Sequence, residues 1–206
     1  NSFTPTTAGY FGVALSKNNT LQFLDLSRNK LKSYGVWPIA ISLMNNTVLR
    51  TIDLRYNSID SSGAEMICEL LSTNTSIYVM RLSGNIFDDN AINLIANVLK
   101  VNTTLKDIEL NNVQMGSSGF ISLCNALKSN TTLERISLSS NQFTSRSLSS
   151  FADLMKKNTP LQVFEMSDCS IDDNGCTFIA EGIMSNSNLI ELDISKNLIR
   201  TKGAMM

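Results

Sequence analysis

The chain has 206 residues, is 43% hydrophobic and carries a formal net charge of −1 at pH 7. A charge so close to neutrality argues against capture of nucleic acid or of an anionic membrane by broad electrostatic attraction. The lack of histidine excludes histidine-dependent triads, histidine general bases and histidine metal sites. No apolar run approaches the length of a transmembrane helix, and no phosphate-binding or dinucleotide-binding glycine loop occurs.

One apolar pattern, L-x-x-L-x-L-x-x-N-x-L, recurs at intervals of 28 residues without insertion or deletion. Its opening residues are Leu21, Leu49, Ile77, Leu105, Leu133, Leu161 and Leu189. A fixed period of about 20 to 50 residues indicates stacked repeats, in which each unit buries its apolar side against its neighbours. Since no Pro-rich or Gly/Ser-rich linker interrupts the period, residues 1–206 are predicted to form a single solenoid domain.

The first half of each repeat is predicted to be a strand. Leu24 and Leu26 are two residues apart, so both side chains point to one side, and Asp25 points to the other. An asparagine eight residues after the opening position is expected to satisfy backbone groups where the strand bends away. This asparagine is Asn29, Asn57, Asn85, Asn141 or Asn197, with Val113 and Cys169 at the same position in the other two repeats. Valine cannot form these bonds, so local strain or hydration is expected at Val113.

The second half of each repeat is predicted to be a helix. Val36, Ile39, Ala40 and Leu43 follow the i, i+3, i+4, i+7 spacing of a single apolar stripe, and later repeats preserve it. Helices are expected to begin near a column of mostly small residues: Gly35, Gly63, Ala91, Gly119, Ser147, Gly175 and Gly203. They are expected to end, in the left-handed conformation, at a column of asparagines: Asn18, Asn46, Asn74, Asn102, Asn130, Asn158 and Asn186.

The two ends of the chain differ from this pattern. Residues 1–20 match only the helical half of a repeat, and the chain stops three residues after Gly203. Solenoids normally carry polar capping units at their ends, and neither end has one. The sequence is therefore predicted to be part of a longer protein.

The four cysteines, Cys68, Cys124, Cys169 and Cys176, occupy structural positions of the repeat, and we expect buried, reduced thiols. No C-x-x-C pair is present, and no metal or other cofactor is expected. Most of the five N-x-S/T sequons fall in the asparagine column that ends the helices, which explains them without a glycan. Reduced thiols are typical of a reducing compartment, so we predict a cytoplasmic, intracellular location.

The outward side of the strands holds the candidate binding residues. Four residues after each opening position the column reads Asp25, Asp53, Arg81, Glu109, Ser137, Glu165 and Asp193. Neighbouring strands lie about 4.8 Å apart, so like charges repel, and Arg81 is placed to offset Asp53 and Glu109. Adjacent columns add Arg55, Tyr56, Asp107, Arg135, Asp168 and Glu191. These residues predict either a net acidic recognition surface for a basic or mixed-charge partner or a face that is charged only for solubility.

Tyr34 and Trp37 form a second candidate patch, because other repeats mostly carry polar residues at the same positions. Exposed aromatic residues at polar positions can mark a contact site. The alternative is that the two rings cover an N-terminal neighbour or pack on Pro38.

The combined pattern, followed by G-x-x-x-L/I-A/C, resembles the leucine-rich repeats of the ribonuclease-inhibitor-like class over essentially the whole chain. The resemblance implies an α/β fold: a curved solenoid, or horseshoe, of about seven repeats with parallel strands on the concave face and α-helices on the convex face. Relatives include ribonuclease inhibitors, NOD-like receptors, Ran GTPase-activating proteins, tropomodulin-like actin regulators and axonemal proteins.

Two classes of function follow from this resemblance. The first is a non-enzymatic module that binds a protein or peptide through the concave strand face, with no catalytic residue, small-molecule substrate, nucleic acid or membrane involved. The second is a GTPase-activating protein of the Ran type, although no residue of this chain can be assigned that role. A pathogen effector and a cytoskeletal or axonemal scaffold are further alternatives that use the same fold.

Overall fold

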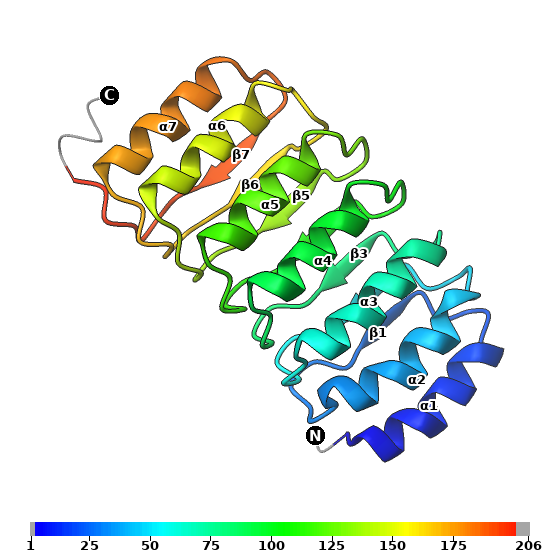
Figure 1. Cartoon of the computed structure of the whole chain (residues 1–206). Helices are drawn as coiled ribbons and strands as arrows, with labels where there is room; N and C mark the ends of the chain where they lie inside the picture. The colour runs from blue at the N-terminus through cyan, green and yellow to red at the C-terminus, as the bar shows by residue number, and fades with distance from the viewer. Residues whose placement is uncertain (1–2, 201–206) are drawn as a thin grey trace.

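The computed structural model describes residues 3–200, in which helices and strands alternate along the chain (Figure 1). The helices are α1 (Pro5–Lys17), α2 (Lys32–Met44), α3 (Ser61–Thr73), α4 (Asp89–Leu99), α5 (Ser117–Leu127), α6 (Ser149–Met155), preceded by the 3₁₀ turn η1 (Ser145–Leu148), and α7 (Asp173–Met184). The strands are β1 (Phe23–Asp25), β2 (Thr51–Asp53), β3 (Val79–Arg81), β4 (Asp107–Glu109), β5 (Arg135–Ser137), β6 (Val163–Glu165) and β7 (Glu191–Asp193). The strands form one sheet in chain order, and every neighbouring pair is parallel. The predicted solenoid fold is confirmed.

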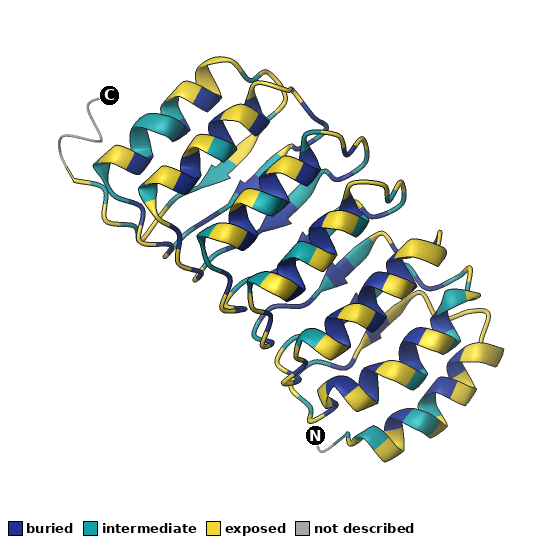
Figure 2. Cartoon of the chain, viewed as in Figure 1, coloured by how far each residue is buried: buried dark blue, intermediate teal, exposed yellow. Residues whose placement is uncertain are grey.

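The sheet register repeats the sequence period. Leu24 pairs with Ile52, and Ile52 pairs with Met80, so each residue lies beside its equivalent 28 positions later. The helices pack side by side against one side of the sheet, and their inward residues are buried while their outward residues are exposed (Figure 2). The core is therefore a continuous apolar layer between sheet and helices, to which every repeat contributes the same positions.

The asparagines that follow the strands form a buried ladder between repeats. The Nδ2 of Asn57 donates to the carbonyls of Leu26, at 2.9 Å, and Leu54, at 3.1 Å. Asn85 does the same one repeat later, at 3.0 Å from Leu54 O and 2.7 Å from Leu82 O. Each carbonyl is thus within reach of two asparagines.

That overlap keeps the carbonyls around Val113 paired. Asn85 serves the carbonyl of Leu82 and Asn141 serves that of Leu110, at 2.8 Å, so the valine leaves neither acceptor without a donor. Valine has no oxygen to accept from the N–H groups of Asn85 and Phe87, whereas Asn85 accepts from those of Asn57 and Ile59 at 3.0 and 3.1 Å, so hydration at Val113 stays a prediction. Val113 itself is fully buried. Its neighbours Asn112 and Gln114 have positive φ angles, but so do the equivalent Tyr56 and Ser58 of a repeat that has the asparagine.

A second asparagine ladder joins each helix end to the next strand, and here the expected left-handed backbone is wrong. Asn74 is extended, with φ −78° and ψ 133°. Its Oδ1 accepts from the N–H groups of Ser76 and Ile77, at 2.8 and 2.9 Å. Its Nδ2 donates to the carbonyls of Leu43 and Asn46 in the preceding repeat, at 2.7 and 2.8 Å. The column requires asparagine because one side chain both closes the turn and joins two repeats.

Asn158 is the one member of this column whose side chain does not close the turn in this way. The residue two positions later is Pro160, which has no N–H to donate to the asparagine oxygen. Asn158 instead adopts φ 48°, and its Oδ1 accepts from Ser187 in the following repeat at 2.8 Å. Only in this member of the column does the left-handed prediction hold.

Helices α2–α5 and α7, and the turn η1, begin two or three residues before the column of small residues, which agrees with starts near that column. Capping side chains set the first turns of α3, α4 and α7. Asp172 caps α7 by accepting from the N–H of Gly175 at 2.9 Å, and Ser145 of the preceding repeat donates to the same carboxylate at 2.5 Å. Asp60 and Asp88 cap α3 and α4 in the same way. Gly203, the last predicted helix start, lies outside the described residues.

The repeat that contains η1 departs from the pattern because it is rich in serine. Ser147 donates to the carbonyl of Thr144 at 2.7 Å, and Ser149 donates to that of Arg146 at 2.9 Å. Hydroxyls that bond to nearby carbonyls compete with regular helix hydrogen bonds. The first turn here is 3₁₀, and α6 is correspondingly short.

Candidate functional site

The candidate site is the strand face, defined as the outward side chains of β1–β7 and of the residues that directly flank each strand. The central residue of β1–β6 is buried under the helices, while the residues on either side of it point away from them. Packing therefore does not restrict these outward positions, and their identity changes from one repeat to the next. All twelve predicted strand-face residues lie on this surface.

The middle of the strand face is held together by ion pairs. Arg55 binds the carboxylate of Asp53, with its Nε at 3.0 and 2.9 Å from the two oxygens, and reaches Glu109 two strands away at 3.5 Å. Arg81 lies 3.1 Å from Glu109 and 4.0 Å from Asp53, in the offsetting position expected from the sequence. Asp53 has no exposed surface, so it supports this cluster and is not available to a partner.

Asp107 lies beside this cluster with a carboxylate that is incompletely satisfied. Its Oδ1 is buried and accepts no hydrogen bond from the described residues. Burial raises the pKa of Asp107, although Arg135 acts in the opposite direction. The guanidinium of Arg135 is engaged by Glu165 on the next strand. Asp107 is therefore the central strand-face group most in need of a donor.

Tyr56 is clamped where the chain leaves β2. The guanidinium carbon of Arg28 lies 4.4 Å from the ring centroid, and on the other side a Cβ at Gly84 would lie 2.3 Å from a ring carbon. Arg28, Tyr56 and Gly84 share one column of the repeat, and all three have positive φ angles. A glycine in the third repeat therefore lets the tyrosine ring lie flat between its neighbours.

A second arginine–tyrosine pair flanks the other end of the strands, and the sequence analysis did not identify it. Arg50 lies 5.1 Å from the ring centroid of Tyr78 and also donates to the carbonyl of Ser76 at 3.2 Å. Tyr78 is 38% exposed, and Phe23 on β1 is 52% exposed. Tyr78 lies one position after the opening residue of its repeat and Phe23 lies two positions after its own. Alternation along a strand predicts the side on which such a residue lies, but not whether it contacts a partner.

The remaining predicted residues lie towards the two ends of the sheet. Asp25 is exposed on β1, and hydrogen bonds from Ser27 lower its pKa. Asp168 accepts from Ser140 at 3.1 Å, and Asp193 on β7 accepts from the N–H of Ser195 at 2.9 Å. Neither Glu191 nor Asp193 forms an ion pair within residues 3–200.

These positions refine the expected net acidic surface. The half of the strand face around β1–β3 carries Arg28, Arg50, Arg55 and Arg81 against Asp25 and Asp53. The half around β4–β7 carries Asp107, Glu109, Glu134, Glu165, Asp168, Glu191 and Asp193 against Lys106, Arg135 and Lys196. The surface is thus polarised along the solenoid, basic and aromatic at one end and acidic at the other.

Tyr34 and Trp37 lie on α2, on the opposite side of the molecule from the strand face. They are 81% and 51% exposed, so neither ring is covered by α1. The structure does not bring this second candidate patch together with the strand-face residues.

The remaining polar chemistry of the chain is structural. Cys68, Cys124 and Cys169 are buried, and Cys176 is only half-buried. Burial raises the pKa of the Cys68 thiol to about 12 and that of Cys169 to about 11. The described cysteine and carboxylate side chains form no group that could hold a metal ion. No helix in the described range is long and apolar enough to cross a membrane.

Comparisons with known proteins agree with this geometry. The profile described as Leucine Rich repeat matches residues 17–40, 45–68, 129–152, 157–180 and 185–206, together more than half of the chain. No curated protein matches the sequence. Among solved structures, actin-binding site 2 of leiomodin-1 superposes with a TM-score of 0.62 at 19% identity, over 71% of this chain and 86% of that one. The C-terminal domain of Caenorhabditis elegans tropomodulin gives a TM-score of 0.62 at 15% identity, over 73% and 92%. The chain belongs to the leucine-rich repeat family.

Proposed function

We propose that the chain is a non-catalytic interaction module and that its strand face binds a protein or peptide partner. The single observation that carries the proposal is the incomplete satisfaction of Asp107, whose buried carboxylate oxygen lies beside the ion pairs at the centre of the strand face. An unsatisfied buried acceptor is costly in the free protein, and a partner that supplies a donor removes that cost. The fixed spacing of the strands supports the proposal, because it offers one long surface for many modest contacts.

The polarity of the strand face defines the partner in more detail. Tyr56 and Tyr78, each beside an arginine, offer rigid amphipathic rings at the basic end, and aromatic and arginine residues are enriched among energetically dominant contacts. The acidic end offers Glu191 and Asp193, neither of which forms an ion pair among the described residues. The partner is therefore of mixed charge: acidic or apolar groups face β1–β3, and Lys or Arg residues face β4–β7.

The test compares capture of partners from the native source by matched variants. Replacing Asp107→Asn, Glu191→Gln and Asp193→Asn together removes charge from the acidic end without disturbing the buried Asp53–Arg55 pair. Asp153→Asn with Glu181→Gln on the helix face is the control. A partner that the control retains and the strand-face variant loses supports the proposal, and Tyr56→Ala should weaken the same partner. Equal retention by all three variants would contradict it.

Actin is the specific protein that we propose to test first. The leiomodin-1 domain that shares this fold is named as an actin-binding site. Co-sedimentation with filamentous actin and cross-linking to monomeric actin would detect the interaction. If actin binds, the strand-face variant should reduce binding and the helix-face control should not.

A further inference from the structure

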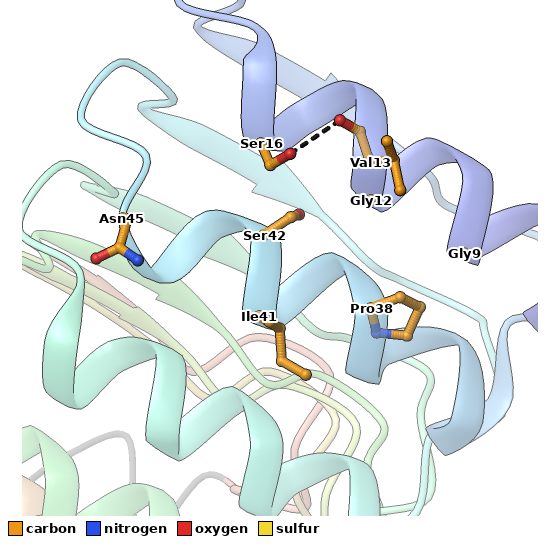
Figure 3. A pocket seen from close by; sticks show the side chains of 8 residues that line it. All are labelled: Gly9, Gly12, Val13, Ser16, Pro38, Ile41, Ser42 and Asn45. Atoms are coloured by element: carbon orange, nitrogen blue, oxygen red, sulfur yellow. Dashed lines mark hydrogen bonds between the residues drawn. The ribbon is translucent and has the colours of Figure 1, made fainter.

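A groove with exposed apolar walls lies between α1 and α2 on the helix side of the molecule (Figure 3). Its volume is about 500 Å³, and it is lined by Gly9, Gly12, Val13, Ser16, Pro38, Ile41, Ser42 and Asn45. The helices meet closely at Gly12, where a Cβ would lie 2.6 Å from the carbonyl oxygen of Pro38. At Gly9 they diverge, because a Cβ there would have no atom within 4 Å. Gly12 thus lets α1 approach α2 closely, and the missing side chain of Gly9 leaves the open space of the groove.

Exposed apolar side chains line the rim of this groove. Val13 on α1 is 60% exposed, and Trp37 and Ile41 on α2 are 51% and 52% exposed. Trp37 and Ile41 are one helical turn apart, as are the groove residues Gly9 and Val13. The two helices therefore present parallel apolar edges on either side of the groove.

The equivalent positions of the later helices are mostly polar. The column of Val13 and Ile41 continues as Glu69, Asn97, Asn125, Asp153 and Glu181. The column of Trp37 continues as Glu65, Asn93, Ile121, Ser149 and Thr177. Solubility alone favours polar residues at exposed sites, so apolar residues at these positions in the first two helices indicate a surface that is covered by a partner.

Charge around the groove identifies the kind of partner. Neither α1 nor α2 contains an acidic residue, and each carries one lysine at a helix end: Lys32 starts α2, and Lys17 lies in the last turn of α1, one turn beyond Val13. The next helix, α3, presents Glu65 and Glu69 in line with Trp37 and Ile41, and within residues 3–200 neither glutamate forms an ion pair. A chain lying in the groove would thus have apolar contacts below it and two available carboxylates along the side that faces α3.

We propose that this groove is a second docking surface and that its occupant is an amphipathic helix of a partner protein. The apolar stripe of that helix would lie between Val13 and Ile41, and its Lys or Arg residues would face Glu65 and Glu69. A helix laid in an apolar groove is a recurrent mode of recognition that uses anchors at i, i+3, i+4 and i+7. The surface lies on the helix side, so it is independent of the strand-face function.

Trp37 makes the proposal directly measurable, because it is the only tryptophan in the chain. The probe is a tryptophan-free synthetic helix of about 18 residues, with leucines along one stripe and lysines along one flank. Binding in the groove should shift Trp37 emission to shorter wavelength as the ring leaves water. A second peptide with glutamates in place of the lysines should bind about tenfold more weakly, because two surface ion pairs become repulsive contacts.

Variants separate the groove from other surfaces. Gly9→Leu fills the open space without a backbone clash, and Ile41→Glu places a charge on the rim, so each should weaken the lysine peptide more than about tenfold. Asn97→Glu, at the same position on α4, is the matched control and should leave binding unchanged. Glu65→Lys combined with Glu69→Lys should reverse the preference between the two peptides. Circular dichroism would verify that each variant is folded.

Three results would overturn the proposal. The first is an unchanged Trp37 spectrum with the lysine peptide, and the second is equal binding of both peptides. The third is a concentration-dependent spectral shift without peptide that Gly9→Leu abolishes, which would identify a second copy of the chain as the occupant. Tyr56→Ala on the strand face should leave peptide binding intact, so failure of one proposal can be distinguished from failure of the other.

Discussion

The helix-to-strand turns and the strand face follow opposite rules. In the turns the same asparagine makes the same bonds in successive repeats, as at Asn74 and Asn130. On the strand face the equivalent residues include Asp25, Arg81 and Ser137, and their partners differ in each repeat. Columns that stay constant are those on which stacking depends. Columns that vary are free of that requirement and can be shaped by a partner.

The largest expected effect comes from breaking a turn. Asn74→Ala removes three bonds that the side chain accepts, two of them from backbone N–H groups, and two that it donates, at a residue only 4% exposed. The carbonyls of Leu43 and Asn46 lose this donor. The free energy of unfolding should fall by about 3 kcal/mol, since buried polar groups lose their partners. Urea unfolding followed by circular dichroism measures it. Asn45→Ala, at an exposed asparagine, is the control, and similar losses in both variants would contradict the ladder.

A smaller effect is expected at the cap of α7. Asp172→Ala should cost about 1 kcal/mol at neutral pH, the usual value of a capping side chain. The hydroxyl of Ser145 and the N–H of Gly175 lower the pKa of Asp172 from its ordinary value of 3.8. The stability it contributes is therefore complete above that value and is lost as the pH falls through the folded-state pKa. Unfolding curves of the two proteins should converge in acid, and a constant difference down to about pH 2 would argue against this account.

On the strand face, by contrast, a substitution should improve stability. Burial raises the pKa of Asp107, so Asp107→Asn should increase the free energy of unfolding at neutral pH by less than about 1 kcal/mol. Below the ordinary pKa of 3.8 the carboxyl is protonated in both folded and unfolded states, and the gain should disappear. The gain should grow as the pH rises through the folded-state pKa.

Asp107→Asn should also affect binding of the strand-face partner. The Asp107→Asn variant should bind the partner more weakly although its melting temperature rises, because the carboxylate that binds the partner also lowers the stability of the free protein. If the variant is instead destabilised at pH 7, the attraction between Asp107 and Arg135 stabilises the folded protein by more than burial of the Asp107 charge costs.

The period of 28 residues was sufficient to predict the strands, the core columns and the order of the sheet. The helix starts could be predicted only to within two or three residues, because the small-residue column does not show which preceding residue, such as Asp60 or Asp172, caps the first turn. Strand-face residues could be placed on the correct side by alternation. Their pairing could not be predicted, since long arginine side chains such as Arg55 reach a partner two strands away.

The turn asparagines show a different limit. Two mechanisms favour asparagine at the end of a helix: tolerance of a left-handed backbone, and a side chain that accepts from the next N–H groups. Residue type alone does not separate them. Pro160 does, because a proline at the position that would donate its N–H forbids the second mechanism in that repeat alone.

That distinction yields the smallest prediction. Asn158→Gly removes the bond from the N–H of Ser187 at 2.8 Å and two long bonds, at 3.4 Å, with the Ser187 hydroxyl and the Ser185 carbonyl, all at an exposed site. It also relieves a side chain at φ 48°, so the unfolding free energy should change by less than about 0.5 kcal/mol. Asn130→Gly, where the backbone is not left-handed and the side chain is buried, should cost several times more. Urea unfolding of the two variants side by side measures the difference. Equal losses would mean that Asn158 contributes through its side chain after all, and that Pro160 changes the shape of the turn without changing what holds it.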